Sequence, residues 1–409
     1  MSKDIKFIDD DVRFIMEEIN KNGFEAYIVG GCVRDILLER EPKDFDITTS
    51  ALPEDVKKIF PKTFDTGIEH GTVTVVLNKT NYEVTTFRID GEYKDSRRPE
   101  EVIFTPNLKE DLSRRDFTVN AIAYSDETGY VDLFNGMEDL KNKIIRGVGN
   151  PDKRFKEDAL RIMRAIRFSA QLGFDIEDET YKGILENREL LKNISVERIR
   201  EELIKTISGD YIENLKLISK TEILKSINPK YHDYLRAHED LFIEKLKNAS
   251  KDLLIRISIM LQFLTADECA VFLTFLKFDN LMINNVSAIV KEINFELKKE
   301  NYFIKKLINR MGKELFLNLI ITRLFINLSE EDFEDLKNIY DRVINEPIFL
   351  KDLKINGNDL KNIGITDGKK IGKCLNYLLD CVLKNAELNN FEDLKNESLK
   401  FCDCDNRSS

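Results

Sequence analysis

The segment AYIVGGCVRDILLEREPKDFDITT, residues Ala26–Thr49, determines the fold that we expect for the first part of the chain. Residues 27–29 form an apolar run typical of a short buried strand, a glycine pair follows, and residues 33–39 predict a helix. Asp44 and Asp46 lie two residues apart on the next expected strand, so both side chains point to one face. Such carboxylates can hold hard divalent cations, and glycines at a helix start leave room for phosphate against backbone N–H groups. The segment therefore predicts a site for a magnesium-bound nucleoside triphosphate.

The sequence around this segment predicts a small mixed sheet with helices, followed by a helical remainder. Two β-branched runs, residues 72–77 and 82–89, are typical of a hairpin. From Pro151 onward, strand signals nearly vanish and helical periodicity continues to the end. The fold class is therefore α+β, with a mixed-sheet head and an all-α remainder. The other expected elements are helices at 7–21, from 52, and at 112–124, and strands at 101–104, 131–134 and 144–148.

The composition indicates an ordered protein and excludes several classes. Of the 409 residues, 42% are hydrophobic and 33% are charged, and the net charge of −11 argues against a sequence-blind coat on nucleic acid. The acidic start has no apolar core for export, and no apolar run approaches the ~20 residues of a membrane span. We therefore expect a cytoplasmic protein whose six cysteines are reduced. Three histidines without an H-E-x-x-H run disfavour a histidine-built metal hydrolase.

The chemistry expected at Asp44 and Asp46 is phosphoryl transfer with two magnesium ions. Two Mg²⁺ ions about 3.5–4 Å apart steady the attacking and leaving oxygens of such a reaction. Glu83 is a third candidate ligand if its strand lies beside the strand of Asp46. A lone D-x-D is often only a pair of solvated acids. The phosphate-binding candidates nearby favour a metal site instead. These candidates are Gly30, Gly31 and Arg34.

The segment Ser113–Asn120, SRRDFTVN, begins an apolar run with two arginines and an aspartate. Arg115 can contact a triphosphate, and Asp116 or Asn120 can hydrogen-bond a ribose hydroxyl. A cluster of capping residues and salt bridges accounts for the same residues equally well, so the segment alone leaves both interpretations open.

A row of charges follows in Arg154–Ala170, RFKEDALRIMRAIRFSA, which predicts one amphipathic helix. The members of this row recur every three residues and are Asp158, Arg161, Arg164 and Arg167. An aspartate and an arginine three residues apart are neighbours on a helix surface. Such a pair can read the edge of a base while the later arginines contact phosphate. The alternative is a solvated charged face held by ion pairs.

Glycines and lysines alternate in the C-terminal segment 351–390. A glycine turn before a helix start at 368–371 can grip a nucleic-acid phosphate. Four nearby lysines would add a salt-sensitive contribution to nucleic-acid binding: Lys361, Lys369, Lys370 and Lys373. A surface helical hairpin is the alternative.

Together these motifs resemble the class II tRNA nucleotidyltransferase/bacterial poly(A) polymerase family. Residues 26–203 follow the order and spacing of that family in GGCVRD, DFD, SRRDFTVNAIAY, VDLFNGMEDLKNKIIRGVGNPDKRFKEDALRIMRAIRFSAQLGF and SVERIREEL. The chain as a whole resembles the bacterial CCA-adding members. The resemblance implies four parts: a polymerase beta-like nucleotidyltransferase head at 1–145, a helical neck at 146–210, a helical body at 211–345 and a tRNA-binding tail at 346–409.

The resemblance also implies roles for the candidate residues. Asp44 and Asp46 would be the catalytic metal ligands, and Asp158 and Arg161 would form a protein template for the incoming C or A base. The nucleotide-binding residues would be Gly30, Gly31, Arg34, Arg115, Asp116, Asn120, Asp158, Arg161, Arg164 and Arg167.

The expected activity is addition of C, C and A to the tRNA 3′ end from CTP and ATP, with release of pyrophosphate and no obligate protein partner. Members that add only CC resemble CCA-adding enzymes with a shortened loop, whereas residues 88–104 here resemble the full-length loop. Poly(A) polymerases carry a basic run where this chain has GIEHGTV, residues 67–73. The tail lacks the proline expected before Gly368. The alternatives are an A-adding or CC-adding enzyme, a poly(A) polymerase, and a noncatalytic RNA-binding relative.

Overall fold

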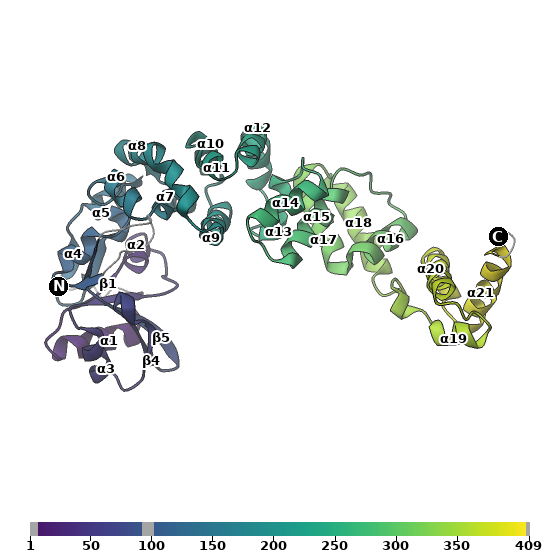
Figure 1. Ribbon diagram of the computed structural model, residues 1–409, viewed down its shortest axis with the longest axis horizontal. Coiled ribbons are helices and arrows are strands. Elements are labelled where there is room, and N and C mark those ends of the chain that lie inside the picture. The colour runs from purple at the N-terminus through teal and green to yellow at the C-terminus, as the bar shows by residue number, and fades with distance from the viewer. Residues whose placement is uncertain (1–6, 92–101, 406–409) are drawn as a thin grey trace. The chain divides into compact units, whose positions relative to one another are not determined.

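The computed structural model describes residues 7–91 and 102–405, and it divides into two compact units, Met1–Ile243 and Glu244–Ser409. The first unit holds a mixed sheet followed by helices, and the described part of the second is helical (Figure 1). The predicted α+β class, with a mixed-sheet head and a helical remainder, is confirmed. The division falls inside the segment 211–345 that we predict as one body, so the four-part organisation stays a prediction.

A seven-stranded sheet forms the centre of the head. Only β2 (Asp46–Thr49) and β5 (Thr80–Thr86) run parallel, and the other neighbouring strands in this sheet are antiparallel. All four residues of β1 (Ala26–Val29) are buried, so both faces of the sheet are covered at this strand. The strand order is β3 (Thr63–Gly67), β4 (Thr72–Leu77), β5 (Thr80–Thr86), β2 (Asp46–Thr49), β1 (Ala26–Val29), β8 (Ile122–Ser125) and β9 (Gly129–Asp132).

Helices cover this sheet and continue the first unit. An apolar stripe of α1 (Asp10–Lys21), including Val12 and Ile15, is buried, and α1 packs on β1 and β2. Helix α2 (Gly31–Leu37) packs on β1 and β8, and α3 (Pro53–Ile59) packs on β4 and β5. The helices are α1 (Asp10–Lys21), α2 (Gly31–Leu37), α3 (Pro53–Ile59), α4 (Leu108–Ser113), α5 (Gly136–Asn142), α6 (Pro151–Glu157), α7 (Leu160–Leu172), α8 (Asp178–Asn187), α9 (Val196–Ile207), α10 (Lys216–Lys220), α11 (Ile223–Ile227) and α12 (Pro229–Leu246).

Two further strand pairs complete the first unit. Strands β10 (Ile144–Ile145) and β11 (Asp175–Ile176) pair in parallel. Strands β6 (Arg88–Asp90) and β7 (Val102–Phe104) pair in antiparallel fashion and form the two ends of the loop predicted at 88–104. Residues 92–101 of that loop lie outside the described residues.

The hairpin β4–β5 is confirmed, with a tighter turn than its sequence predicts. Only Asn78 and Lys79 connect the strands, with φ angles of 48° and 69°. Two left-handed residues in a two-residue loop match the right-handed twist of the flanking strands. The turn therefore tolerates a lysine in a conformation that favours glycine.

The helix predicted at 112–124 is wrong. Helix α4 ends at Ser113, Phe117 is extended with φ −130° and ψ 150°, and β8 begins at Ile122. All four residues of β8 are buried between β1 and β9, so this strand lacks the apolar–polar alternation of a half-buried strand. A short, continuous apolar run of this kind cannot be told from a buried helix by its periodicity.

The single helix predicted over 154–170 is also wrong, because the helical conformation is interrupted at Asp158. This residue has φ −138° and ψ 103°, and it separates α6 from α7. Its carboxylate accepts a hydrogen bond from the backbone N–H of Leu160 at 3.1 Å. Asp158 therefore stands at the start of a helix rather than within one, because aspartate competes for local backbone donors.

The described part of the second unit is a helical assembly with its own hydrophobic core. Phe316 and Tyr340 stack in this core with ring centroids 5.8 Å apart. No helix among the described residues has the length and apolar character needed to cross a membrane. The helices are α13 (Leu253–Met260), α14 (Ala266–Phe275), α15 (Asn280–Glu292), α16 (Asn301–Met311), α17 (Lys313–Ile326), α18 (Glu330–Val343), α19 (Gly357–Asn362), α20 (Gly368–Lys384) and α21 (Phe391–Asp405).

Candidate active site

Three acidic side chains line a cavity where β2 and β5 begin to pair. Asp46 is the first residue of β2, and its Cα lies in register with that of Glu83 on the parallel strand β5. The neighbouring strand predicted for Glu83 is thereby confirmed. Asp44 precedes β2 rather than lying on it, so the expected alternation of two strand residues is wrong. All three carboxylates nevertheless line one cavity of about 780 Å³.

The electrostatics of Asp46 suit a cation. Burial raises the pKa of the Asp46 carboxyl; Arg115 opposes this rise, and the negative charges of Asp44 and Glu83 add to it. A divalent cation would relieve the repulsion among these acids, and an all-oxygen donor set is what hard cations prefer. Within residues 7–91 and 102–405, however, no three His, Cys, Asp or Glu side chains converge closely enough to form a metal site. Glu83 as a third ligand therefore stays a prediction.

The glycine pair shapes the turn between β1 and α2. Gly30 has φ 84°, in the left-handed region, and a Cβ there would lie 3.2 Å from Nη1 of Arg115 and 3.8 Å from Oδ2 of Asp46. This close approach explains why the turn needs glycine. Gly31 begins α2, three residues before Arg34. The structure thus brings the glycines, Arg115 and a candidate metal ligand together.

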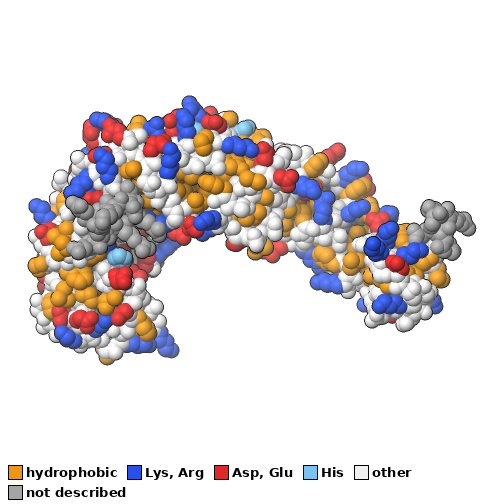
Figure 2. Space-filling view, in the orientation of Figure 1, with side chains coloured by type: hydrophobic (Ala, Val, Ile, Leu, Met, Phe, Trp, Pro, Cys, Tyr) orange, Lys and Arg blue, Asp and Glu red, His pale blue; other side chains and the backbone are white. Residues whose placement is uncertain are grey.

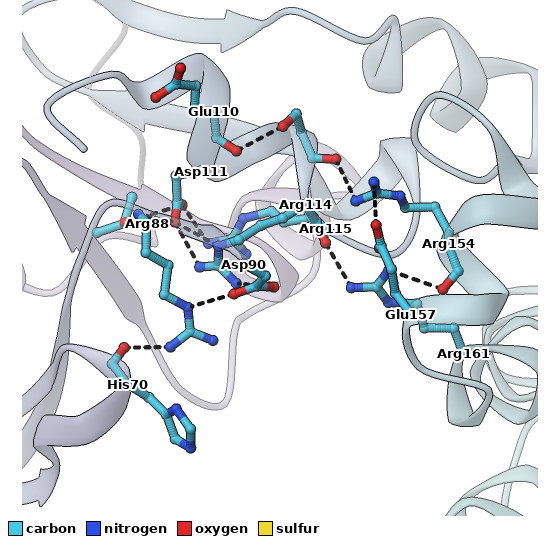
Figure 3. A network of polar contacts seen from close by, with 12 residues as sticks. His70, Arg88, Asp90, Glu110, Asp111, Arg114, Arg115, Arg154, Glu157 and Arg161 are labelled. Carbon is cyan, nitrogen blue, oxygen red and sulfur yellow. Dashed lines mark hydrogen bonds and ion pairs between the residues drawn. The ribbon is translucent and has the colours of Figure 1, made fainter. Parts of the chain in front are cut away.

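Asp111 is a fully buried carboxylate that binds both arginines of the SRRD segment. Its Oδ1 accepts from Nη2 of Arg114 at 2.6 Å, and its Oδ2 accepts from Nη2 of Arg115 at 3.4 Å (Figure 3). The Thr48 hydroxyl of β2 donates to the same Oδ2 at 3.3 Å. Burial alone would raise the pKa of Asp111, but Arg114 and Arg115 outweigh it and lower the pKa. The segment is therefore anchored to the strand that begins with Asp46.

A second network connects the predicted ribose-binding residues to α2 and α7. Arg34 donates to the Asn120 side-chain oxygen at 2.8 Å, and Asn120 donates to Asp116 at 3.1 Å. Arg164 pairs with the other Asp116 oxygen at 2.6 Å. Burial alone would raise the pKa of Asp116, but Arg164 and the hydrogen bond from Asn120 hold it at about 2. Asp116 is therefore a carboxylate at neutral pH.

Asp158 and Arg161, the two residues predicted to read the base, each have partners within the protein. Arg161 Nη1 pairs with Glu157 at 2.8 Å, and its Nη2 donates to the backbone oxygen of Arg114 at 2.8 Å (Figure 3). Asp158 pairs with Arg198 of α9 at 2.9 Å. Arg161 is thus held against the SRRD backbone.

The structure identifies polar residues that the sequence analysis missed. Glu157 binds Arg154 at 2.7 Å as well as Arg161, and Arg154 in turn donates to the backbone oxygen of Ser113 at 3.1 Å (Figure 3). The spacing of three and four residues from Glu157 to these arginines is a signal that could have found it. Asp111 carries a similar signal, because Arg114 and Arg115 follow it at three and four residues.

The candidate tail lysines lie in the second unit, at the start of α20. Asp367 caps this helix by accepting from the backbone N–H of Lys370 at 2.9 Å. Lys369, Lys370 and Lys373 are exposed. The visible face carries Lys and Arg side chains over α20 (Figure 2). The predicted role of these lysines in tRNA binding stays a prediction.

Comparison with known proteins agrees with this architecture. Three family models match: the poly A polymerase head domain at residues 26–146, the probable RNA and SrmB-binding site of polymerase A at 173–235, and tRNA nucleotidyltransferase domain 2 at 248–396. The CCA-adding enzyme of Lactobacillus helveticus is 40% identical over 394 residues, which cover 95% of this chain and 96% of that protein. The CCA-adding enzyme of Enterococcus faecalis is 39% identical, with 93% of each chain covered.

Solved structures extend the similarity to three dimensions. The Bacillus stearothermophilus CCA-adding enzyme, solved in complex with CTP, matches with a TM-score of 0.84 at 31% identity, and each chain is covered completely. A Thermotoga maritima CCA-adding enzyme, solved with tRNA, shares the fold with a TM-score of 0.64 at 22% identity, with 97% of each chain covered. Full-length identity near 40%, one shared fold and the assembled motifs lead to one conclusion: this chain belongs to the family of CCA-adding enzymes.

Proposed function

We propose that this protein is a CCA-adding tRNA nucleotidyltransferase. It adds C, C and A to the 3′ end of tRNA from CTP and ATP without a nucleic-acid template, and it releases pyrophosphate. The observation that carries this proposal is the full-length similarity to CCA-adding enzymes, one of which was solved with CTP. The clustering of Asp44, Asp46, Gly30 and Arg115 at one end of the sheet supplies the chemistry that such a transfer needs.

The chain's own carboxylates and arginines position the reactants. Asp44 and Asp46, with Glu83 as a further candidate, would hold two Mg²⁺ ions at the head cavity. When bound, these ions would lower the pKa of the tRNA 3′-hydroxyl and neutralise charge on the triphosphate. Arg115 and Arg34 would bind the phosphates, and the turn at Gly30 and Gly31 would leave space for them. Positioning and charge neutralisation supply most of the rate enhancement in phosphoryl transfer.

The selectivity would come from the SRRD segment and the start of α7. Asp116 is ionised and buried, so it can accept a hydrogen bond from a ribose hydroxyl. Asp158 and Arg161 would read the base edge, because a carboxylate accepts from an exocyclic amine and a guanidinium donates to ring atoms. To do so, they must exchange some of their contacts with Arg198 and Glu157 for contacts with the nucleotide.

The acceptor would be bound by shape and backbone through the helical parts. We assign the neck to 146–210, the body to 211–345 and the tRNA-binding tail to 346–409, with Lys369, Lys370 and Lys373 as phosphate contacts. Local basic groups of this kind suit a chain whose net charge is −11. We further propose that the protein works in the cytoplasm.

An extension assay tests the activity. The purified protein receives a tRNA transcript that ends before CCA, with CTP alone, ATP alone or both. Two additions with CTP, and one A only after them, are expected. A long A tract would identify a poly(A) polymerase, and arrest after CC or addition of A alone would identify a specialised relative. No incorporation under any condition would mean a noncatalytic RNA-binding protein.

The metal assignment has its own test. Asp44→Ala should abolish nucleotide incorporation while leaving the melting temperature near that of the wild type, because Asp44 is exposed. Asp55→Ala removes a surface acid that pairs with Lys58 on α3, and it serves as the matched control with normal activity. Normal incorporation by Asp44→Ala would refute the assignment.

A further inference from the structure

Three guanidinium groups surround the ring of Phe168 on α7. The Cζ atoms of Arg167, Arg34 and Arg164 lie 4.3, 5.2 and 5.4 Å from the ring centroid. Cations at these distances are attracted by the negative face of an aromatic ring. Only 5% of Phe168 is exposed, so solvent weakens this attraction little. The ring thus connects an arginine of the head helix α2 with two arginines of α7.

Phe168 is itself fixed by an aromatic neighbour. Phe117 meets it edge to face, with centroids 5.8 Å apart and an interplanar angle of 83°. Phe117 is fully buried and lies between the SRRD arginines and Asn120 in sequence. Edge-to-face pairs of this kind favour one relative orientation of the two rings. The orientation of Phe168 is therefore set by the segment that carries Arg115 and Asp116.

The three arginines repel one another. Each is held by a different acidic residue, and these acids belong to different parts of the fold. Arg34 pairs with Asp35 at 2.8 Å and Arg167 with Glu202 of α9 at 2.9 Å, while Arg164 pairs with Asp116. Burial, reinforced by the charge of Arg164, lowers the pKa of Arg167 to about 10. A fourth carboxylate at the centre would compete with phosphate for these groups. An aromatic ring attracts them without adding a negative charge.

We infer that Phe168 is a positioning residue for nucleotide binding: its ring aligns Arg34 of the head with Arg164 and Arg167 of α7 toward the triphosphate. This inference rests on the proposed function, in which Arg34 binds the phosphates, and on the nucleotide-binding role that the family resemblance implies for Arg164 and Arg167. It assigns the ring no contact with the substrate. Loss of the ring should therefore weaken the binding of phosphates and leave the contacts to base and ribose largely intact.

The test compares nucleotide affinities in the full-length protein by calorimetry, with CTP and CMP as probes. Phe168→Leu and Phe168→Met remove the ring but keep an apolar side chain, and Met keeps the core filled with a flexible chain. Phe168→Tyr keeps the ring faces. Phe155→Leu is the matched control, because Phe155 is buried on the adjacent helix α6 with 1% exposure. Melting temperatures are measured for all variants.

We expect CTP affinity to fall about tenfold in Phe168→Leu and Phe168→Met and to stay within about twofold in Phe168→Tyr and Phe155→Leu. CMP affinity should change less than about twofold throughout. Equal losses of affinity for CTP and CMP would show that Phe168 has only a packing role. A Phe155→Leu variant as impaired as Phe168→Leu would show the same. A Tyr variant as weak as the Leu variant would also count against the ring. If the wild type binds CTP no better than CMP, the proposed nucleotide site itself fails.

Discussion

At the scale of single residues, Asp46 shows how a functional site costs stability. It is the first residue of β2, its carboxyl pKa is raised by burial, and its negative neighbours Asp44 and Glu83 oppose its ionisation. Because the folded pKa exceeds the ordinary value of 3.8, stability falls as pH rises from that value through the raised pKa. At neutral pH the ionised group therefore destabilises the metal-free fold.

Asp46→Asn should consequently be inactive but not destabilised. Without divalent cations, we expect its melting temperature to be no lower than that of the wild type. Mg²⁺ should raise the melting temperature of the wild type and have less effect on the variant, since ligand binding stabilises the folded state. Differential scanning fluorimetry with Mg²⁺ or a chelator makes the measurement. Equal responses of the two proteins to Mg²⁺ would exclude Asp46 as a ligand.

The contribution of Asp116 to stability should have the opposite pH dependence. Its pKa of about 2 lies below the ordinary 3.8, so its stabilisation is present above pH 3.8 and is lost as pH falls toward 2. Asp116→Asn should lower the free energy of unfolding of the head by about 2 kcal/mol at pH 7, and the difference should shrink below about pH 4. Urea titrations at several pH values test this. Asp55→Asn, at an exposed pair, should change the free energy by less than about 1 kcal/mol.

At the scale of elements, the turn of the β4–β5 hairpin allows a stabilising change. Lys79 has φ 69°, where an L-residue with a Cβ is strained and glycine is not. Lys79→Gly should therefore raise the free energy of unfolding by about 0.5–1 kcal/mol without loss of activity. The same substitution at Lys57, inside α3, should lower it by about 1 kcal/mol. Chemical denaturation of both variants checks the contrasting signs, and destabilisation by Lys79→Gly would contradict this explanation.

The sequence predicts the elements whose apolar residues follow a clear period or whose turns carry glycine or proline. Strand β1, helix α1 and the hairpin β4–β5 were expected within a few residues of their observed bounds. Prediction fails at β8, because a fully buried strand has no polar alternation. It fails again at Asp158, because the break that this residue causes depends on a local hydrogen bond rather than on hydrophobic period.

In the candidate site, too, residues in local motifs could be predicted and residues that act through tertiary contacts could not. The sequence identifies Gly30, Asp46 and Arg115 as site candidates because they lie in short motifs. The structure places these three within a few ångströms of one another. It cannot show which side chains hold them. Asp111 is marked only by its spacing of three and four residues from Arg114 and Arg115. Phe168 acts through contacts that depend on the packing of α7, and nothing in a single sequence distinguishes a supporting ring from an ordinary one.

At the scale of the whole molecule, the predicted nucleotide and tRNA contacts fall in different compact units. The nucleotide candidates lie within Met1–Ile243, and the tail lysines lie within Glu244–Ser409. Substitutions in the tail should therefore change the KM for tRNA without changing the affinity for CTP.

The triple variant Lys369→Ala/Lys370→Ala/Lys373→Ala tests this separation. We expect the KM for tRNA to rise at least about tenfold, and the slope of log affinity against log salt to fall by about 2 units, because fewer counterions are released. The control replaces Lys57, Lys58 and Lys62 of the head by alanine and makes the same change in net charge. An unchanged salt slope in the tail variant would remove these lysines from the tRNA interface.

Strand β1 has a further consequence, because it lies between β2 and β8 with all four residues buried. Gly30 follows its last residue, and Asp46 pairs with that residue, Val29. Deuterium can reach the amides of β1 only when the head sheet opens, so these amides should be among the slowest in the protein to exchange. The same opening would separate the glycine turn from Asp46. Loss of CTP binding on heating should therefore coincide with melting of the head, whatever the state of the second unit.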